Sequence, residues 1–423
     1  MNSSVNSEQP LTPYTVLDLT EGGFNWCGKV LADLGADVIK VEPPGGSPTR
    51  NVGPFVDGKP GEDRSLFWAS YCANKRSITL DLKDTDDAAQ FRHLASRADV
   101  LIESFMPGQM DELGLGYDSI SRSNPGLVYT SITPFGQTGP YSQFSAPDLI
   151  AWSMGGMQYL GGNEDRQPVR ISAPQAQLHA GAHAAAGTMA ALWHSRNTGI
   201  GKQVDVSMQT AVVWTLMNAT PFPPLHGTNM ERSGDYRARG HITVRHVFGC
   251  RDGYLSVVQA PRTLRGLAEW MEEESAAPLW LSAIDWDEWN PGSIGEYDSD
   301  AIDLFHRVQK RMEEFISSKT KNELYLRAID HGILLAPCQT VQDIAESVQL
   351  EARGFWSELE HESLGRSLTH LGPFISMSES PVQIRLPAPR VGEHNEKILH
   401  GKEDISPGVG QPKKIQPLKS QPK

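Results

Sequence analysis

Residues 14–46 read YTVLDLTEGGFNWCGKVLADLGADVIKVEPPGG, and this stretch decides the fold. Residues 14–19 form a short aliphatic and β-branched run, which a Gly-Gly pair then interrupts. Apolar residues recur at helical spacing as far as Gly35, and residues 36–41 (ADVIKV) are a second apolar run that ends at a Pro-Pro-Gly-Gly turn. The order strand, helix, strand predicts a βαβ unit with a right-handed crossover and two parallel strands.

The same alternation continues along the N-terminal half of the chain. It includes the alanine-rich stretch 175–194, in which small residues allow close helix packing. The pattern predicts an α/β fold with an open, doubly wound, Rossmann-like parallel sheet that carries helices on both faces. The expected strands are 14–19, 36–41, 77–82, 100–103, 127–132 and 202–208, and the expected helices include 85–97, 110–114, 147–157, 175–194 and 209–217.

The composition of the chain changes after this half. The prolines of PFPPLH at 221–226 are expected to break any regular element, which predicts a linker. A hairpin that turns at Arg251-Asp-Gly-Tyr and an acidic, Trp-rich helical region follow, which predicts a smaller α+β domain. The expected parts are a large domain from 11–222, a small domain from 227–333, a C-terminal segment from 334–405 that returns to the large domain, and a flexible tail from 406–423.

The overall composition excludes several kinds of protein. The chain has 423 residues and a formal net charge of −13, so nucleic acid is not an expected partner. It contains no apolar run of about 18 residues, so we expect neither a membrane span nor a membrane partner. The four cysteines form no CxxC pair, which predicts neither a disulfide framework nor a zinc site. A cytoplasmic protein without a bound metal or a permanently bound cofactor is the expectation.

Several segments, in the same order, resemble the class III coenzyme A transferases, the group of formyl-CoA transferase, carnitine CoA transferase and α-methylacyl-CoA racemase. The resemblance spans roughly residues 14–400 and implies a Rossmann-like large domain with a smaller inserted domain. It also implies an interlocked dimer of two ring-like chains. Beyond residues 16–46, the matching segments are NKRSITLDLK at 74–83, TPFGQTGPY at 133–141, GTMAALWHSRNTGIGKQVDVSMQTAV at 187–212, ARGFWSELEH at 352–361 and PAPRVGEHNEKIL at 387–399.

The resemblance also implies where coenzyme A, as free CoA or an acyl-CoA substrate, would bind. Two positions depart from the family pattern, because family arginines are replaced by Pro43 and Glu112, and a glutamate repels phosphate. CoA could instead use other cations, such as Arg50, Lys75 or Arg76. The residues implied for the CoA site are Leu80, Lys83, Ser104, Phe105, Phe135, Gly136 and Met208.

Gln177 stands where the resemblance places the catalytic aspartate of the transferases. That aspartate attacks the acyl-CoA thioester, forms a mixed anhydride and then an aspartyl-CoA thioester, and finally passes CoA to the acceptor acid. A carboxylate is needed because the nucleophile must be ionised and must be regenerated. A glutamine amide can form hydrogen bonds but cannot form the anhydride. No residue of this chain is therefore assigned as the nucleophile.

The racemases of the group use a paired histidine and acid instead, and neither is present here. Pro147 replaces the histidine and Gln177 replaces the acid. His179 and His183 lie four residues apart on one helix face, but no third metal ligand follows them, so a packed or partly exposed pair is expected. Asp148 is expected to cap the helix that begins beside it.

Three hypotheses are compatible with these residues. In the first, the chain is the non-nucleophilic subunit of a heteromeric CoA transferase, and a paralogous subunit supplies the aspartate. The benzylsuccinate CoA transferase of anaerobic toluene breakdown is a family example with two unequal, related subunits, and its donor suggests succinyl-CoA. In the second, the chain is an enzyme with altered CoA-ester chemistry, such as a hydrolase, dehydratase, lyase or racemase-like enzyme. In the third, it is a non-catalytic scaffold that binds CoA esters.

Overall fold

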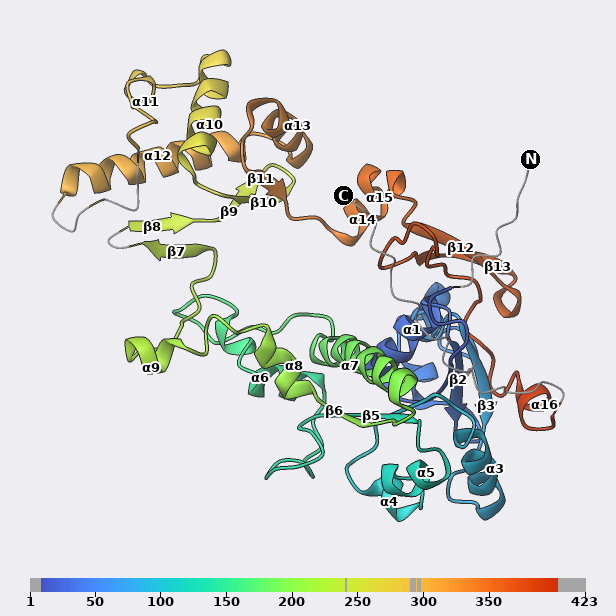
Figure 1. The fold of residues 1–423 in the computed structure, drawn as a ribbon. Coiled ribbons are helices and arrows are strands. Elements are labelled where there is room, and N and C mark those ends of the chain that lie inside the picture. Colours follow the sequence, from blue (N-terminus) through green and yellow to red (C-terminus); the bar gives the residue numbers. More distant parts are fainter. Residues whose placement is uncertain (1–8, 240–241, 290–293, 295–297, 402–423) are drawn as a thin grey trace, which may run out of the picture. The chain divides into compact units, whose positions relative to one another are not determined.

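The computed structural model describes residues 9–239, 242–289, 294 and 298–401 (Figure 1). The tail expected at 406–423 lies outside these residues. The described chain divides into two compact units, each with hydrophobic clusters of its own. The first unit contains the described parts of Met1–Met157, Ile171–Pro221 and Gln349–Lys423, and the second contains those of Gln158–Arg170 and Phe222–Val348.

A six-stranded parallel sheet forms the centre of the first unit (Figure 1). Its strand order is β3-β2-β1-β4-β5-β6, so the chain builds outward from β1 in one direction and then returns to build outward in the other. The predicted doubly wound α/β sheet is thereby confirmed. Ligands of such sheets bind at the carboxyl ends of the strands where the order reverses, which here lies between β1 and β4. The strands are β1 (Thr15–Leu19), β2 (Asp37–Glu42), β3 (Lys75–Thr79), β4 (Val100–Glu103), β5 (Val128–Thr133) and β6 (Gln203–Ser207).

Helices cover both faces of this sheet. Neighbouring strand residues point to opposite faces, and apolar side chains on both faces need to be buried. Val16 belongs to a buried cluster with α1 and α7, whereas Leu17 belongs to a second cluster with α3. The helices are α1 (Asn25–Asp33), α2 (Leu66–Tyr71), α3 (Thr85–Ala95), α4 (Gln109–Glu112), α5 (Tyr117–Ser123), α6 (Asp148–Met154), α7 (Ala176–Thr198) and α8 (Met208–Trp214).

The long helix α7 approaches α1 closely, as its small residues predict. A Cβ atom at Gly181 would lie only 3.1 Å from the Cβ of Trp26 and 3.3 Å from the backbone nitrogen of Cys27. The neighbouring residues Ala180 and Ala184 are fully buried. Larger side chains at these positions would force the two helices apart. This packing brings the N-terminal end of α7 to the loop that follows β1.

The structure corrects two expected elements. Strand β3 ends at Thr79, so Leu80 and Lys83 lie beyond the strand rather than in it, in the turn that leads to α3. The proline-rich residues 221–226 do not break all regular structure, because Phe222–His226 forms a short helix, α9. Prolines at the second and third positions of a helix are tolerated because the N–H groups of the first turn have no helical partners.

The C-terminal part of the first unit contains the hairpin β12 (Trp356–His361) and β13 (Arg366–Leu371), then α16 (Asn395–Ile398). Asn395 fastens this part to the edge strand β3, since its side chain accepts a hydrogen bond from the Thr79 backbone and donates one to the Thr79 hydroxyl. The backbone nitrogen of Ser77 donates to His394 over 3.2 Å. Residues more than 300 positions apart are thus joined at this edge.

The second unit contains two small antiparallel sheets and a helical cluster. The predicted hairpin is confirmed, because β9 (Val247–Cys250) pairs with β10 (Gly253–Val257) across a turn at Arg251. No helix of the described residues in either unit is long and apolar enough to cross a membrane. The remaining elements are β7 (Tyr236–Arg239), β8 (Ile242–Arg245), α10 (Pro261–Glu273), α11 (Leu279–Ser282), α12 (Ser299–Ser317), α13 (Lys321–His331), β11 (Leu335–Pro337), α14 (Val341–Ala345) and α15 (Val348–Ala352), whose last residues return to the first unit.

Candidate active site at the switch point of the sheet

Hydrogen bonds join the two loops that flank the switch point. The backbone nitrogen of Glu21, after β1, donates to the hydroxyl of Ser104, after β4, over 3.0 Å. The next nitrogen, that of Gly22, donates to the Thr49 hydroxyl over 2.8 Å. The Glu21 carboxylate in turn accepts hydrogen bonds from the hydroxyls of Ser47 and Thr49. These bonds hold the β1 loop on both sides, so its conformation is set before a ligand arrives.

Gln177 lies in the first turn of α7 and contacts this loop. Its carboxamide oxygen accepts a hydrogen bond from the backbone nitrogen of Gly23 over 2.9 Å. A Cβ atom at Gly23 would lie 2.8 Å from both the Cβ and the Oε1 of Gln177, so only glycine leaves room for this contact. Gly22 has a φ of +58°, a conformation that favours glycine. The local structure therefore explains why both residues of the pair are glycines.

Asp148 does not cap its own helix, which corrects the prediction. Pro147 occupies the N-cap of α6, and Asp148 is the first helical residue. Its two carboxylate oxygens instead accept hydrogen bonds from the backbone nitrogens of Gln175, over 3.0 Å, and Gln177, over 2.8 Å. These nitrogens have no helical partners, because they lie at the start of α7. Asp148 thus fixes the backbone that carries Gln177.

The two histidines of α7 differ in their surroundings. His179 lies edge-on to Trp152 with ring centroids 5.7 Å apart, and its buried Nδ1 has no hydrogen-bond partner among the described residues. Burial lowers the pKa of His179, and the nearby His183 adds to this effect. His183 is exposed and lines a cavity of about 270 Å³ beside the start of α8. His179 is therefore packed and partly exposed, as expected for the pair, whereas His183 is more exposed than expected.

The residues implied for the CoA site occupy different environments. Lys83 is exposed, and Ser104 and Phe105 are half-buried in the turn after β4, at the switch point. Leu80 and Met208 are buried in the two hydrophobic clusters that cover the sheet, which fits a packing role rather than direct contact with a ligand.

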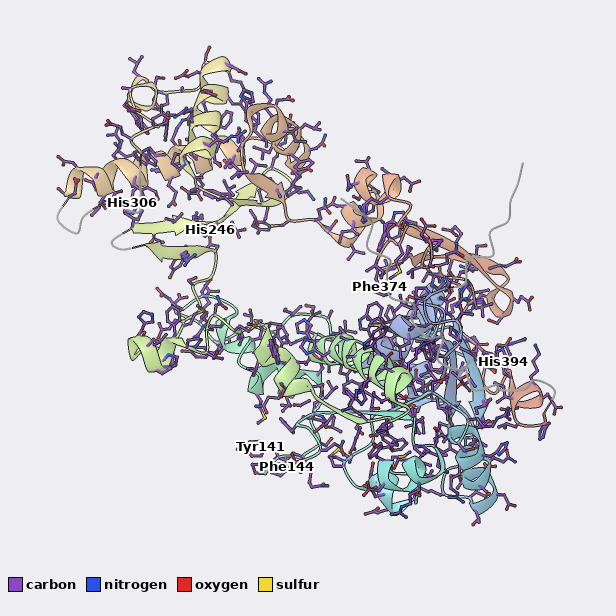
Figure 2. All side chains as sticks on the ribbon, viewed as in Figure 1. Tyr141, Phe144, His246, His306, Phe374 and His394 are labelled. Carbon is purple, nitrogen blue, oxygen red and sulfur yellow. The ribbon has the colours of Figure 1, made fainter. Side chains whose placement is uncertain are left out.

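Phe135 and Gly136 line the cavity that contains His183. Gly136 has a φ of +90°, so glycine is favoured at this turn. The loop continues to Tyr141 and Phe144, whose exposed rings stack with centroids 5.3 Å apart (Figure 2). Gln177 contacts the loop after β1, whereas His183, six residues later on α7, lines this cavity. Of the residues predicted for the CoA site, only Phe135 and Gly136 line this cavity.

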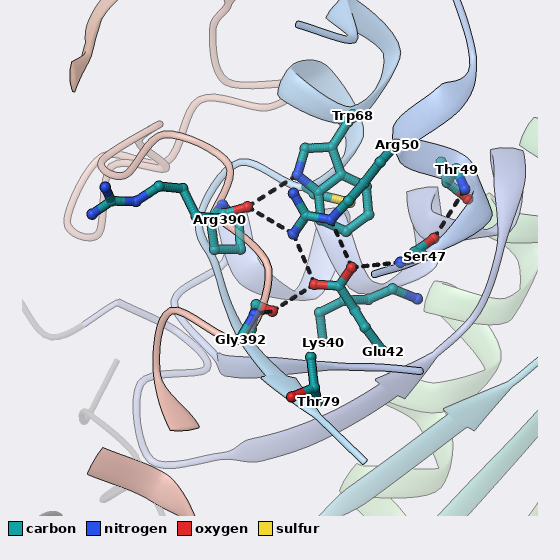
Figure 3. A network of polar contacts seen from close by, with 12 residues as sticks. Lys40, Glu42, Ser47, Thr49, Arg50, Trp68, Thr79, Arg390 and Gly392 are labelled. Atoms are coloured by element: carbon teal, nitrogen blue, oxygen red, sulfur yellow. Dashed lines mark hydrogen bonds and ion pairs between the residues drawn. The ribbon is translucent and has the colours of Figure 1, made fainter. Parts of the chain in front are cut away.

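The alternative cations proposed for CoA are already engaged. Arg50 donates to both carboxylate oxygens of Glu42 over 2.7 and 2.8 Å and to the carbonyl of Pro389, and it stacks on Trp68 at 3.9 Å (Figure 3). Lys75 is 1% exposed and donates to Asp18 over 2.7 Å. Breaking such buried pairs is costly, so neither cation is available for a phosphate group.

Arg76 is half-buried and forms an ion pair with Asp37. All three arginine and lysine candidates therefore stabilise the first unit in this structure.

Sequence reasoning missed Glu103, the last residue of β4. Its side chain is 4% exposed and accepts a hydrogen bond from the backbone nitrogen of Phe105 over 2.7 Å. Burial raises the pKa of Glu103 to about 7, although hydrogen bonds from Ser131 and Phe105 act against this shift. The sequence did contain a signal for Glu103, because it is a carboxylate at the carboxyl end of a strand beside the switch point.

Comparisons with known proteins identify the family. The model of CoA-transferase family III matches residues 11–395. The chain is 35% identical to the succinyl-CoA:(R)-benzylsuccinate CoA-transferase subunit BbsE of Thauera aromatica, and the match covers 92% of this chain and 94% of that protein. It is 32% identical to the succinate–glutarate CoA-transferase of Agrobacterium fabrum, with 96% and 98% covered.

A third relative is the α subunit of the succinyl-CoA–L-malate CoA-transferase of Chloroflexus aurantiacus, with 30% identity over 94% of this chain and 90% of that subunit. The crystal structure of a CAIB/BAIF family protein from Brucella suis has a TM-score of 0.79 and 26% identity, and it covers 94% of this chain and 100% of its own. From the length of the family match and the identities of these relatives, the chain belongs to CoA-transferase family III.

Proposed function

We propose that this chain is the non-nucleophilic subunit of a heteromeric CoA transferase that moves CoA between a CoA thioester and a carboxylic acid. The observation that carries the proposal is the amide of Gln177 at the start of α7, bonded to Gly23 at the switch point. An amide in this position cannot attack a thioester. The named relatives include the BbsE subunit and the α subunit of the malate enzyme, which supports a paralogous partner.

In this proposal, the partner subunit contributes the aspartate. Its carboxylate attacks the thioester carbonyl, a mixed anhydride forms, and the CoA thiolate leaves. The thiolate then attacks the aspartyl carbonyl, so that an aspartyl-CoA thioester forms and the donor acid departs. The acceptor acid repeats the two steps in reverse and leaves as the new thioester, with the carboxylate restored.

The role of this chain is to bind and orient. The Oε1 atom of Gln177 is engaged by Gly23, which leaves its Nε2 hydrogens as donors for the thioester carbonyl oxygen. The Ser104–Phe105 turn and the exposed Lys83 are proposed contacts of the CoA nucleotide. We also propose, from the family resemblance, that the two chains interlock and that residues 227–333 form a small domain within each.

The test compares the purified chain with the chain co-expressed with a family paralogue that retains the aspartate. Succinyl-CoA is the donor, and glutarate, L-malate and benzylsuccinate are the acceptors. We expect transfer only when both chains are present, and an aspartyl thioester that hydroxylamine traps on the paralogue. Gln177→Ala should lower the rate of the complex about tenfold or more. Gln175→Ala is the matched control, because within the described part of the chain the Gln175 side chain bonds only to its neighbour Pro174.

Other outcomes distinguish the alternatives. Transfer at full rate by the single chain would sink the heteromer proposal. Hydrolysis of succinyl-CoA by the single chain would indicate altered chemistry, and CoA binding without any reaction in either form would indicate a scaffold. If Gln177→Asp makes the single chain able to form a thioester that hydroxylamine traps, the remaining site has stayed competent for transfer.

A further inference from the structure

A small polar cavity of about 110 Å³ lies beside the switch point, on the side of the sheet that α4 and α5 cover. It is distinct from the cavity that His183 lines. Glu103 from the end of β4 and Ser131 from β5 contribute to its wall, and Tyr129 from β5 is nearly buried there. The proposed function assigns no role to these residues.

The charged groups that act most strongly on Glu103 are acidic. The acidic groups that face it are Asp111 on α4 and Asp205 on β6, and Asp118 on α5 lines the same cavity. Tyr117 of α5 and Tyr129 of β5 also line the cavity, and burial raises the pKa of Tyr129, to which the negative charge of Glu103 adds. Among the described residues that line the cavity there is no lysine, arginine or histidine.

The acidic residues around this cavity do not form a metal-binding group. No group of three or more metal-ligating side chains occurs within the described part of the chain. A buried carboxylate that has neither a cation nor a metal beside it is expected to take up a proton. Burial raises the pKa of Glu103 to about 7, so this proton is exchanged close to neutral pH.

The protonation state of Glu103 affects the switch point through hydrogen bonds of the turn after β4. The carboxylate accepts from the backbone nitrogen of Phe105 over 2.7 Å, which closes the turn after β4. The same turn presents the Ser104 hydroxyl that accepts from the backbone of Glu21 over 3.0 Å. The turn after β4 and the loop after β1 are therefore held through Glu103. An ionised carboxylate makes a hydrogen bond roughly twice as strong as a neutral one.

We propose that Glu103 is a positioning residue: its ionised carboxylate holds the Ser104–Phe105 turn in the conformation that binds the CoA nucleotide, and proton uptake loosens that turn. This inference rests on the proposed function where it takes the turn as a contact of CoA. The coupling between Glu103 and the turn itself does not depend on that assignment. Its consequence is that CoA esters bind more tightly as the pH rises from 6 to 8.

The direct test is amide hydrogen exchange at Phe105 in the full chain, measured between pH 6 and pH 8 and corrected for the intrinsic exchange rate. We expect the protection of this amide to rise by roughly fivefold with pH, as the hydrogen bond becomes charge-assisted. Glu103→Gln keeps an acceptor but cannot titrate, so its protection should stay constant. Glu112→Gln, which removes the same charge from an exposed site on α4, should retain the rise.

A second variant covers the case in which Glu103→Gln does not fold. The Ser131 hydrogen bond lowers the pKa of Glu103, so Ser131→Ala should move the midpoint of the protection curve to higher pH. A protection curve that is flat in the native chain, or that has the same slope in Glu103→Gln, overturns the inference.

Affinity for succinyl-CoA, measured by calorimetry on the complex at pH 6 and pH 8, tests the link to binding. We expect a gain of roughly fivefold at pH 8 in the native complex and no change with pH in Glu103→Gln. If no form binds succinyl-CoA, the proposed function fails together with this link, whereas the exchange data still decide whether Glu103 controls the turn. The two failures are therefore distinguishable.

Discussion

The carboxamide oxygen of Gln177 accepts a hydrogen bond from the backbone nitrogen of Gly23 over 2.9 Å. The two residues are 154 positions apart, and they meet because α7 packs against α1 and begins beside the loop after β1. An aspartate at this position would be one methylene shorter. The longer glutamine side chain reaches the glycine loop. The hydrogen bond to Gly23 gives this side chain a defined orientation, although it carries no nucleophilic group.

Gly23→Ala should disturb this contact. The new methyl group would lie 2.8 Å from the Cβ and Oε1 atoms of Gln177, so the side chain or the loop must move. We expect a loss of about 1–3 kcal/mol in the free energy of unfolding, measured by urea denaturation, and weaker succinyl-CoA binding by the complex. Gly249→Ala is the control, because a Cβ atom there meets nothing within 4 Å. Equal stability of the two variants would show that the Gly23 loop accommodates the added methyl group without cost.

Asp148→Asn should weaken the start of α7. Asparagine retains one acceptor oxygen, so one of the two backbone nitrogens of Gln175 and Gln177 would lose its partner. The expected cost is about 1–2 kcal/mol in the free energy of unfolding, together with slower CoA transfer by the complex. Asp298→Asn is the control, because Asp298 caps α12 through a single oxygen, which asparagine retains. Unchanged transfer in Asp148→Asn would contradict a positioning role for this carboxylate.

Glu112→Arg should strengthen CoA binding. Glu112 is exposed on α4, and in the proposed CoA site an arginine there would replace repulsion of the phosphates by attraction. We expect roughly tenfold higher affinity for CoA at low salt, with a gain that shrinks as the ionic strength rises. Calorimetry at two salt concentrations measures both effects. Glu351→Arg makes the same charge change at an exposed site on α15, and an equal gain there would mean that only net charge matters.

The buried pair His361 and His370 should make the first unit sensitive to acid. Their Nε2 atoms are 2.8 Å apart between β12 and β13, so one neutral ring donates to the other. Burial lowers the pKa of His370 to about 4, and the charges of His361 and Lys29 add to this shift. The unfolded chain, with a histidine pKa near 6.5, therefore binds more protons at intermediate pH than the folded chain does.

The stability from this pair is fully present above pH 6.5 and is lost as the pH falls toward 4. We expect the free energy of unfolding to fall by up to about 3 kcal/mol over this range. His370→Gln should flatten the dependence, and His400→Gln, at a largely exposed site, should leave it unchanged. Urea denaturation at pH 7 and pH 5 is sufficient to measure this change in the free energy of unfolding. Parallel curves for the native chain and His370→Gln would contradict the assignment.

Local patterns predicted those parts of the structure that local forces determine. The strands at 100–103 and 127–132 follow from short apolar runs, because a strand buried on both faces needs no polar alternation. The helix α9 (Phe222–His226) was missed because proline is unfavourable inside a helix but tolerated in its first turn. Asp148 was assigned to the wrong helix, since a capping residue is recognised from its own neighbours and its actual partners are 27 and 29 positions away.

The sequence by itself determined the doubly wound sheet, the family and the amide at position 177, because apolar spacing, motif order and residue identity are all local properties of the chain. Only the tertiary structure decided what Gln177 contacts, which cations are already engaged and that Glu103 is buried among acidic groups. Arg50 illustrates the reason, because it bonds to Pro389, 339 positions away (Figure 3). Whether a charged side chain is free to bind a ligand depends on packing between distant segments, which residue identity does not contain.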